Sequence, residues 1–110
     1  DFAGLGPRLE KHSAFPNKTN VHFVQIIDRS SIKVLVWERG CGATMACGTG
    51  ACAVMVVSYL LELCNQVVQV ILTGSNLEIS WNGYGEPVYM KGPANKVYEG
   101  IFESENYFLE

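Results

Sequence analysis

The alternation of apolar and polar positions divides the chain into short strands around one long apolar segment. Residues 19–27 and 32–37 are rich in Val, Ile and Phe, and the polar turn Asp28-Arg29-Ser30-Ser31 separates them. Runs of β-branched and aromatic residues on either side of a polar turn are typical of a β-hairpin. Both runs carry apolar residues on both faces, so we expect the sheet to be covered on one face and partly covered on the other.

A long helix is predicted after this hairpin, over about residues 48–64. Ala, Val, Met, Tyr and Leu occupy most of its positions, and Glu62 is its only charged residue. A helix that is apolar nearly all round is buried inside a fold. We expect Asn65 to end it.

Short strands are predicted in the rest of the chain, with turns at Gly74-Ser75-Asn76, Asn82-Gly83 and Gly92-Pro93 between them. The predicted strands are residues 67–72, 77–81, 87–90 and 96–102. One buried helix among mostly antiparallel strands is an α+β layout. Residues 1–18, which contain Gly6-Pro7 and Phe15-Pro16, are expected to form a connecting segment, and residues 19–110 a single domain.

Composition narrows the range of partners and compartments. The chain has 110 residues, 48% of them apolar, which is enough for one core. A net charge of −3 without a basic run argues against nucleic acid as a partner. The N-terminus has neither the basic region nor the apolar run of a signal peptide, and the apolar helix is too short to span a membrane. We therefore expect a cytoplasmic protein, or a plastid one if the source is a plant.

The spacing of the cysteines agrees with this compartment and argues against a metal site. The four cysteines, at positions 41, 47, 52 and 64, include no C-x-x-C pair. Zinc and iron–sulfur sites usually need such pairs, so no metal is expected. Without the spacing of a disulfide framework, four cysteines in a chain of this length suit a reducing compartment.

The candidate chemistry lies in residues 38–53, ERGCGATMACGTGACA. This glycine-rich stretch joins a strand that ends in a charged pair to the start of the apolar helix, where it places Cys47. A helix start carries unpaired N–H donors and a partial positive charge, which attract carboxylate or phosphate and favour a thiolate. The sequence predicts a reactive thiol beside an anion-binding site. On spacing alone, an ordinary buried cysteine is an equal alternative.

The glycines of this stretch do not match the common nucleotide-binding patterns. A P-loop ends in Gly-Lys-Ser/Thr, whereas this turn has Gly48-Thr49-Gly50 without a lysine. The spacing of the glycines also differs from G-x-G-x-x-G, and no acidic residue follows at the place expected for a dinucleotide site. Nucleotide binding is therefore disfavoured.

Residues 38–53 resemble the C-terminal active-site segment of the diaminopimelate epimerase family. The similarity extends from about Gly6 to Phe102. It includes Gly6-Pro7, Leu9-Glu10, Phe15-Pro16, Asn20-Val21-x-Phe23-Val24-Gln25, Thr73-Gly74, Leu77-x-Ile79-x-Trp81 and Gly92-Pro93-Ala94-x-x-Val97-Tyr98-x-Gly100. The resemblance is to the second half of enzymes in this family, which have two similar domains and a second catalytic cysteine in the first. It implies a sheet curled around one central helix and terminal strands exchanged between the domains.

The resemblance also implies a role for each site residue. Cys47 corresponds to the catalytic cysteine of this domain, which acts as a proton carrier without a cofactor. The residues that would bind substrate are Asn20, Glu38, Arg39, Gly48 and Thr49. The N–H groups of the two helix-start residues would hold the reacting carboxylate. Arg39 and Asn20 would hold the distal carboxylate, and Glu38 the distal ammonium.

Two positions depart from the family pattern. Ala43 stands where a glutamate is common, and Cys41 where a small apolar residue is usual. Their effect on the loop is open. Without the resemblance, Glu38 and Arg39 would more often be a solvated pair at a strand end.

The implied activity is epimerisation of LL- to meso-diaminopimelate by two cysteines. The alternatives are another two-cysteine amino-acid racemase, acting on proline or hydroxyproline for example, and a non-catalytic anion-binding domain. The implied partners are diaminopimelate, the N-terminal domain of the same enzyme and a second copy in a homodimer. Of the remaining candidates, His12 and His22 are expected to have surface or structural roles, and Cys52 and Cys64 are expected to lie in the core.

Overall fold

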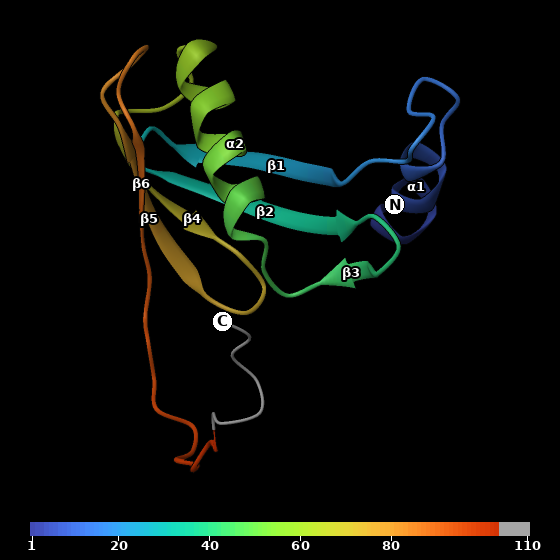
Figure 1. Cartoon of the computed structure of the whole chain (residues 1–110). Coiled ribbons are helices and arrows are strands. Elements are labelled where there is room, and N and C mark those ends of the chain that lie inside the picture. The colour runs from blue at the N-terminus through green and yellow to red at the C-terminus, as the bar shows by residue number, and fades with distance from the viewer. Residues whose placement is uncertain (104–110) are drawn as a thin grey trace.

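The computed structural model describes residues 1–103, which form two helices and six strands (Figure 1). The elements are α1 (Phe2–Glu10), β1 (Val21–Asp28), β2 (Ser31–Glu38), β3 (Gly42–Thr44), α2 (Gly48–Leu60), β4 (Val67–Ile71), β5 (Asn76–Trp81) and β6 (Val88–Lys91). Neither helix in this range is long and apolar enough to cross a membrane. The end of the predicted domain, residues 104–110, lies outside the described residues.

The six strands form one sheet in the order β1-β2-β4-β5-β6, with β3 paired to β2. β1 pairs with β2 along its length, so both other partners of β2 share its second edge. There, residues 31–33 pair in parallel with residues 69–71 of β4, and residues 36–38 pair antiparallel with residues 42–44 of β3. The remaining pairs are antiparallel. The predicted α+β class with a mixed, mostly antiparallel sheet is confirmed.

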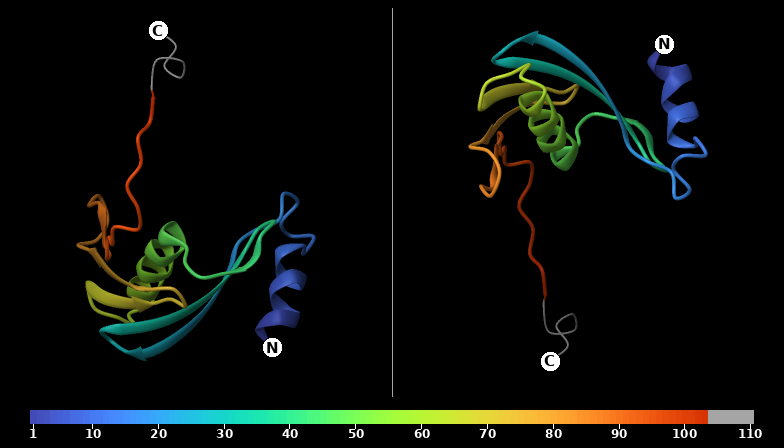
Figure 2. Two further views of the ribbon diagram at one scale, coloured as in Figure 1. Left: turned by 90° about the horizontal axis from the view of Figure 1, so that it is seen from below. Right: turned by 90° about the horizontal axis from the view of Figure 1, so that it is seen from above.

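The core lies between α2 and the concave face of the sheet, which curves around the helix (Figure 2). Alternate residues of β2 point into it, because successive side chains of a strand face opposite sides. Ile32, Val34 and Val36 are buried, while Lys33 and Leu35 are exposed. The core is completed by residues of α2, β4, β5 and the adjoining loops, namely Cys47, Ala51, Val54, Met55, Cys64, Val68, Val70, Leu72, Ile79 and Trp81.

Helix α2 is covered on one side only, which corrects the expectation of a helix buried all round. Its buried residues are Gly50, Ala51, Val54, Met55 and Ser58. Val57, by contrast, is 54% exposed, and Leu61 just beyond the helix is 63% exposed. The helix also ends at Leu60 rather than near Cys64, and a turn follows in which the Leu63 N–H donates to the Ser58 carbonyl. The open apolar side remains because the described residues provide a single sheet layer.

Helix α1 was not predicted, since residues 1–18 were expected to form only a connecting segment. The Asp1 carboxylate caps the helix by accepting from the Gly4 N–H at 3.0 Å. The Phe2 ring packs edge-on against Phe23 and Trp37, with centroid distances of 5.3 and 5.7 Å. These contacts dock α1 on the end of the β1–β2 pair, away from the centre of the sheet (Figure 1).

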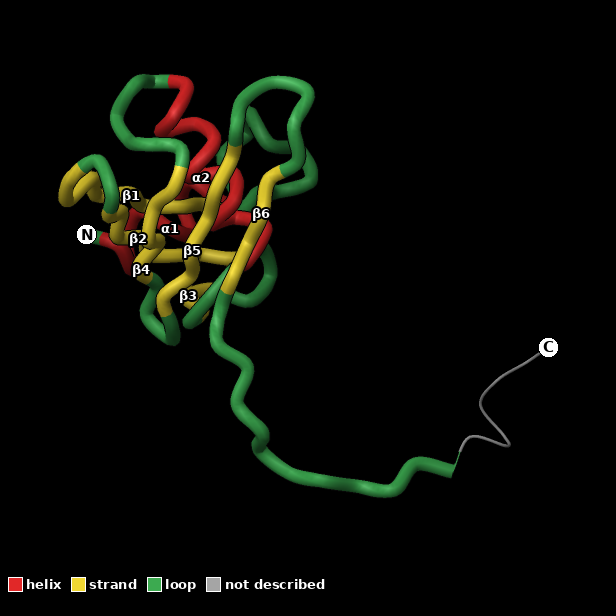
Figure 3. Tube along the Cα trace, turned by 90° about the vertical axis from the view of Figure 1, so that its left-hand side faces the viewer, coloured by secondary structure: helices red, strands yellow, loops and turns green. Residues whose placement is uncertain are grey.

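Two further strand predictions need correction. β3 is a three-residue strand inside the glycine-rich stretch, where no strand was predicted. Residues 96–102, predicted as a strand, contain none. Figure 3 shows the chain leaving the sheet after β6, and Ile101 is 99% exposed. A strand needs a neighbouring edge to satisfy its N–H and C=O groups, and no described strand lies beside this segment.

Candidate active site

The start of α2 combines a thiol with unpaired backbone donors. Cys47 is the N-cap residue, with φ −145° and ψ 102°, and its carbonyl accepts from the Ala51 N–H at 2.9 Å. Its side chain makes no cap hydrogen bond, and its Sγ lies 3.7 Å from the Thr49 Oγ1. The N–H groups of the first helical turn have no acceptor within the helix. Gly48 and Thr49 therefore present donors beside the thiol, the arrangement that anion binding requires.

The glycines at this helix start are required by close packing. A Cβ on Gly50 would lie 1.9 Å from the His22 Nε2, and a Cβ on Gly48 would lie 3.0 Å from the Met90 Sδ. The sequence suggested turn glycines, but both residues belong to α2 and neither has a positive φ. The start of α2 is thus packed between β1 and β6: a side chain at position 50 would displace His22, whereas one at position 48 would need only a small shift of the flexible Met90 side chain.

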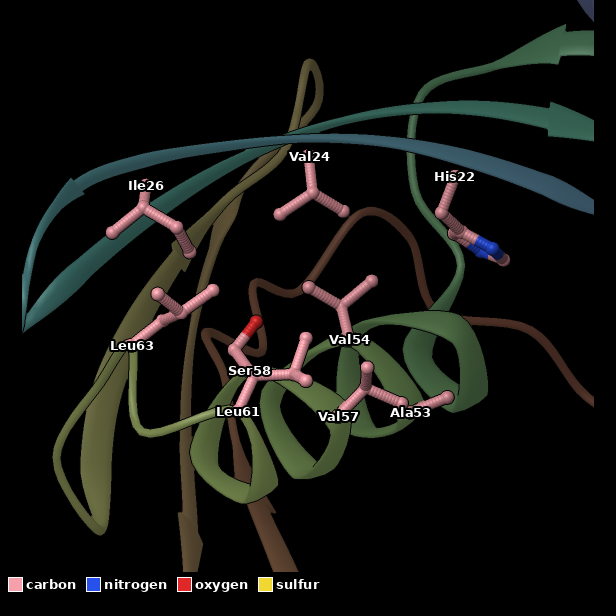
Figure 4. Close-up of a pocket in the computed structure, with 9 residues that line it drawn as sticks. All are labelled: His22, Val24, Ile26, Ala53, Val54, Val57, Ser58, Leu61 and Leu63. Atoms are coloured by element: carbon pink, nitrogen blue, oxygen red, sulfur yellow. The ribbon is translucent and has the colours of Figure 1, made fainter.

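His22 lies beside the start of α2, at one end of a groove between β1 and α2 (Figure 4). The groove has a volume of about 440 Å³ and its walls are largely apolar, as Val24, Ile26 and Leu61 illustrate. The His22 Nε2 is buried and makes no hydrogen bond within the described residues. Burial lowers the pKa of this imidazole, and Glu38 opposes the shift. His22 thus packs against the start of α2, and its surface or structural role stays a prediction.

A second polar group lies at the end of β2. The Asn20 Oδ1 accepts from the Arg39 N–H at 2.8 Å, and the Arg39 Nη1 donates to the Asn17 carbonyl at 3.2 Å. Together with Lys18 and Thr19, these two side chains line a polar pocket of about 270 Å³. Within residues 1–103, Glu38 and Arg39 form no ion pair with each other. The guanidinium is therefore directed to the loop before β1.

β3 separates these two groups of residues. The turn that carries Arg39 leads into β3, and Cys47 follows β3 after a short link. Three residues in a strand span roughly 10 Å. No hydrogen bond joins the two groups within the described part of the chain. A ligand that contacts both groups would need a polar group at each end.

Glu10 is a site-adjacent residue to which the sequence assigned no role. It is only 5% exposed, and its carboxylate accepts from the Gly40 N–H at 3.0 Å and from the Trp37 Nε1–H at 2.8 Å. These two hydrogen bonds lower the pKa of its carboxyl against the effect of burial. The only available signal was its place in the Leu9-Glu10 motif of the family resemblance.

The other cysteines lie in different environments. Cys41 is exposed in the turn after β2. Cys52 is half-buried against the core and Cys64 is 1% exposed within it, and burial raises the pKa of both thiols. The expectation that Cys64 is a core residue is confirmed. Among residues 1–103, no three His, Cys, Asp or Glu side chains are grouped to hold a metal ion.

The fold and this geometry define a class: an α+β domain with a thiol and N–H donors at the start of its central helix, and a separate polar pocket lined by Lys18 and Arg39 at the end of β2. Comparison with known proteins is more specific. The family model for diaminopimelate epimerase matches residues 1–97. The chain belongs to the diaminopimelate epimerase family.

Three curated relatives, each named diaminopimelate epimerase, show the extent of the similarity. The chain is 57% identical over 99 residues to the protein of Prochlorococcus marinus (strain NATL1A), covering 90% of this chain and 35% of the relative. It is 48% identical over 104 residues to that of Acaryochloris marina, covering 94% and 37%. For Methanococcus maripaludis the values are 50% over 96 residues, covering 87% and 35%. The chain thus spans little more than a third of the length of these relatives.

Proposed function

We propose that the full-length protein interconverts LL- and meso-diaminopimelate without a cofactor, and that this chain supplies one catalytic cysteine and part of the substrate site. The observation that carries the proposal is the position of Cys47. It caps α2 beside unpaired N–H groups, in a chain that matches the diaminopimelate epimerase family over residues 1–97.

Inversion at an α-carbon needs a proton carrier on each face. The α-proton of an amino acid is weakly acidic, so one positioned group must remove it while another delivers a proton from the opposite side. Cys47 is proposed to serve one face as thiolate or thiol. The other carrier is proposed to be a cysteine in the other domain of the full-length protein, because the family that residues 38–53 resemble has a second catalytic cysteine in its first domain.

The two polar groups fit the two ends of the proposed substrate. N–H groups of Gly48 and Thr49 would hold the reacting carboxylate and the negative charge that develops on it. At the other end, Arg39 would meet the distal carboxylate with its planar fork, aided by the Asn20 amide. Glu38 would bind the distal ammonium. The span of β3 between the groups suits a substrate with an amino acid at each end.

The proton-carrier role is tested with Cys47→Ala in the full-length protein. Epimerisation should be lost, because one face of the α-carbon has no carrier. In deuterated water, NMR should show α-hydrogen exchange without inversion for one stereoisomer only. Cys52→Ala, which removes a thiol on the same helix, serves as the control and should remain active. Retained epimerisation by Cys47→Ala would exclude Cys47 as an essential carrier, and equal exchange of both isomers would indicate a single mobile base.

The distal clamp separates this proposal from a proline or hydroxyproline racemase, whose substrates lack a second amino acid. Arg39→Lys should reduce transition-state binding by ~1.5–3 kcal/mol, as for a charge-assisted hydrogen bond. The measurement is kcat/KM with LL-diaminopimelate, and Arg8→Lys on α1 is the control. An unchanged kcat/KM would assign Arg39 to its bond with the Asn17 carbonyl alone.

A bound but unreacted substrate in the wild-type protein would favour a non-catalytic anion-binding domain.

A further inference from the structure

The turn of residues 39–41 between β2 and β3 is held from outside the hairpin. Gly40 and Gly42 have φ values of +78° and +81°, a region that favours glycine, and the Cys41 N–H donates to the Glu38 carbonyl at 3.1 Å. Within the turn, the Arg39 N–H is bound by Asn20, and the Gly40 N–H is bound by Glu10. Both acceptors come from residues that precede β1.

Glu10 also holds the loop that carries Asn20. Its backbone carbonyl accepts from the Thr19 N–H at 3.2 Å, while its carboxylate accepts from Gly40 and Trp37. A single residue thus connects both walls of the polar pocket, the loop before β1 and the turn after β2. Each carboxylate oxygen has its own donor, so the carboxylate is fixed in orientation as well as position.

The packing of helix α1 fixes the position of Glu10. Glu10 is its last residue, and Gly6 lies so close to Trp37 that a Cβ on Gly6 would be 2.6 Å from the indole Cδ2. Phe2 packs on the same indole. The same Trp37 indole donates its N–H to the Glu10 carboxylate. Packing by α1 and a hydrogen bond to Glu10 therefore both fix Trp37, which belongs to β2.

We propose that Glu10 is a positioning residue, whose carboxylate sets the turn of residues 39–41 so that Arg39 and Asn20 are in place before the distal end of the substrate binds. This inference rests on the proposed function, because it assigns the polar pocket to the distal carboxylate. Glu10 touches no part of the Cys47 group among its described contacts. It acts on binding at one end of the substrate and leaves the chemistry at the other end unaltered.

The sharpest variant is Glu10→Gln. The amide has the same shape, but it accepts through one oxygen and donates through its nitrogen, so one of the two N–H groups meets a donor instead of an acceptor. In the full-length protein, KM for LL-diaminopimelate should rise about tenfold while kcat changes less than about threefold. Glu86→Gln, an exposed glutamate between β5 and β6, is the matched control and should leave both constants unchanged.

A second variant tests the geometry directly. In Glu10→Gln with Trp37→Phe, the opposing indole N–H is gone, and the glutamine oxygen can accept from Gly40 while its nitrogen faces no donor. KM of the double variant should fall below that of Glu10→Gln alone. A merely structural role predicts the opposite, since the second substitution removes further packing.

Amide hydrogen exchange gives a readout that does not depend on activity. In Glu10→Gln the amides of residues 39–41 should exchange at least several-fold faster, while the Ala51 amide in α2 keeps its wild-type rate. If the wild-type protein does not turn over diaminopimelate but the turn exchanges faster in Glu10→Gln, the proposed function and the substrate assigned to the polar pocket fail, while the effect of Glu10 on the turn of residues 39–41 stands. Unchanged exchange in the turn, or a fall in kcat at constant KM, would overturn the positioning role.

Discussion

At the scale of single residues, the start of α2 is defined by contacts that exclude side chains. Gly50 is helical and buried against His22. It is therefore needed at this position because the imidazole occupies the space of a Cβ. The same contact places an imidazole, whose Nε2 has no hydrogen-bond partner in the described chain, beside the residue three positions after the proposed catalytic Cys47.

Gly50→Ala should destabilise the fold and displace the helix start. A Cβ at 1.9 Å from the His22 Nε2 cannot be accommodated without movement, and overpacking of this kind costs ~1–3 kcal/mol. Urea denaturation of the variant should show this loss, and kcat should fall with it. In His22→Ala with Gly50→Ala the space is free, so much of the loss should be recovered. An alanine variant as stable as the wild type would show that the contact is loose.

His22 should make stability depend on pH. Burial lowers its pKa in the folded state, so below about pH 6.5 the unfolded chain binds more protons than the folded one. The free energy of unfolding therefore falls as the pH drops from about 6.5 toward the folded pKa. Denaturation across pH 7.5–5 should show this decrease in the wild type and in the control His12→Gln, which retains His22, but not in His22→Gln. A decrease of the same size in His22→Gln would contradict the assignment.

At the scale of elements, the strands and α2 could be predicted because their signals are local. Apolar runs between turn sequences identified β1, β2, β4 and β5 to within about two residues, and the unbroken apolar segment identified α2. These elements form the core, so the apolar positions that predict them are largely the side chains that are buried there.

α1 could not be predicted, since its stability comes from outside the helix. Gly4, Gly6 and Pro7 are among its nine residues and are the poorest helix formers. The aromatic contacts of Phe2 and the hydrogen bonds of Glu10 compensate for this, and both partners lie in strands or turns distant in sequence. The segment of residues 96–102 shows the reverse case. Its composition suits a strand, but an adjacent strand edge is required, and sequence alone does not supply one.

The residues of the candidate site also fall into two sets, one predictable from the local sequence and one placed by contacts between distant residues. Cys47, Gly48 and Thr49 are neighbours in sequence at a helix start, so their arrangement could be predicted from the local pattern. The polar pocket could be anticipated only through the family resemblance, and the roles of Asn20 and Glu10 in holding the turn emerge from contacts across 19 and 30 positions of the chain. Backbone hydrogen bonds to side chains at such separations leave no periodic signal.

At the scale of the whole molecule, the open side of α2 has a consequence for the chain by itself. Val57 and Leu61 are more than half exposed beside the apolar groove, and β1 pairs on one edge only in the described sheet. Exposed apolar surface and an unpaired edge favour association. The chain of 110 residues should therefore self-associate, and it should not turn over LL-diaminopimelate because it supplies only one of the two proposed proton carriers.

Sedimentation measures the self-association of the chain, and an NMR assay measures its turnover of LL-diaminopimelate. A variant with Val57→Lys and Leu61→Lys should be more monomeric than the wild-type chain, whereas Tyr84→Lys, exposed on the loop between β5 and β6, should not. A monomeric wild-type chain at high concentration, or measurable turnover, would contradict the respective expectation.

The shared edge of β2 also determines the order in which the molecule can assemble. Pairing of residues 31–33 with residues 69–71 closes a loop that contains β3, the turn of residues 39–41 and the start of α2. Local hairpins close quickly, whereas a contact between distant segments must first overcome the entropy of loop closure. The β1–β2 hairpin can thus form early, whereas the β2–β4 pairing that encloses the start of α2 should form later. We therefore expect the proposed reactive centre to be completed late in folding.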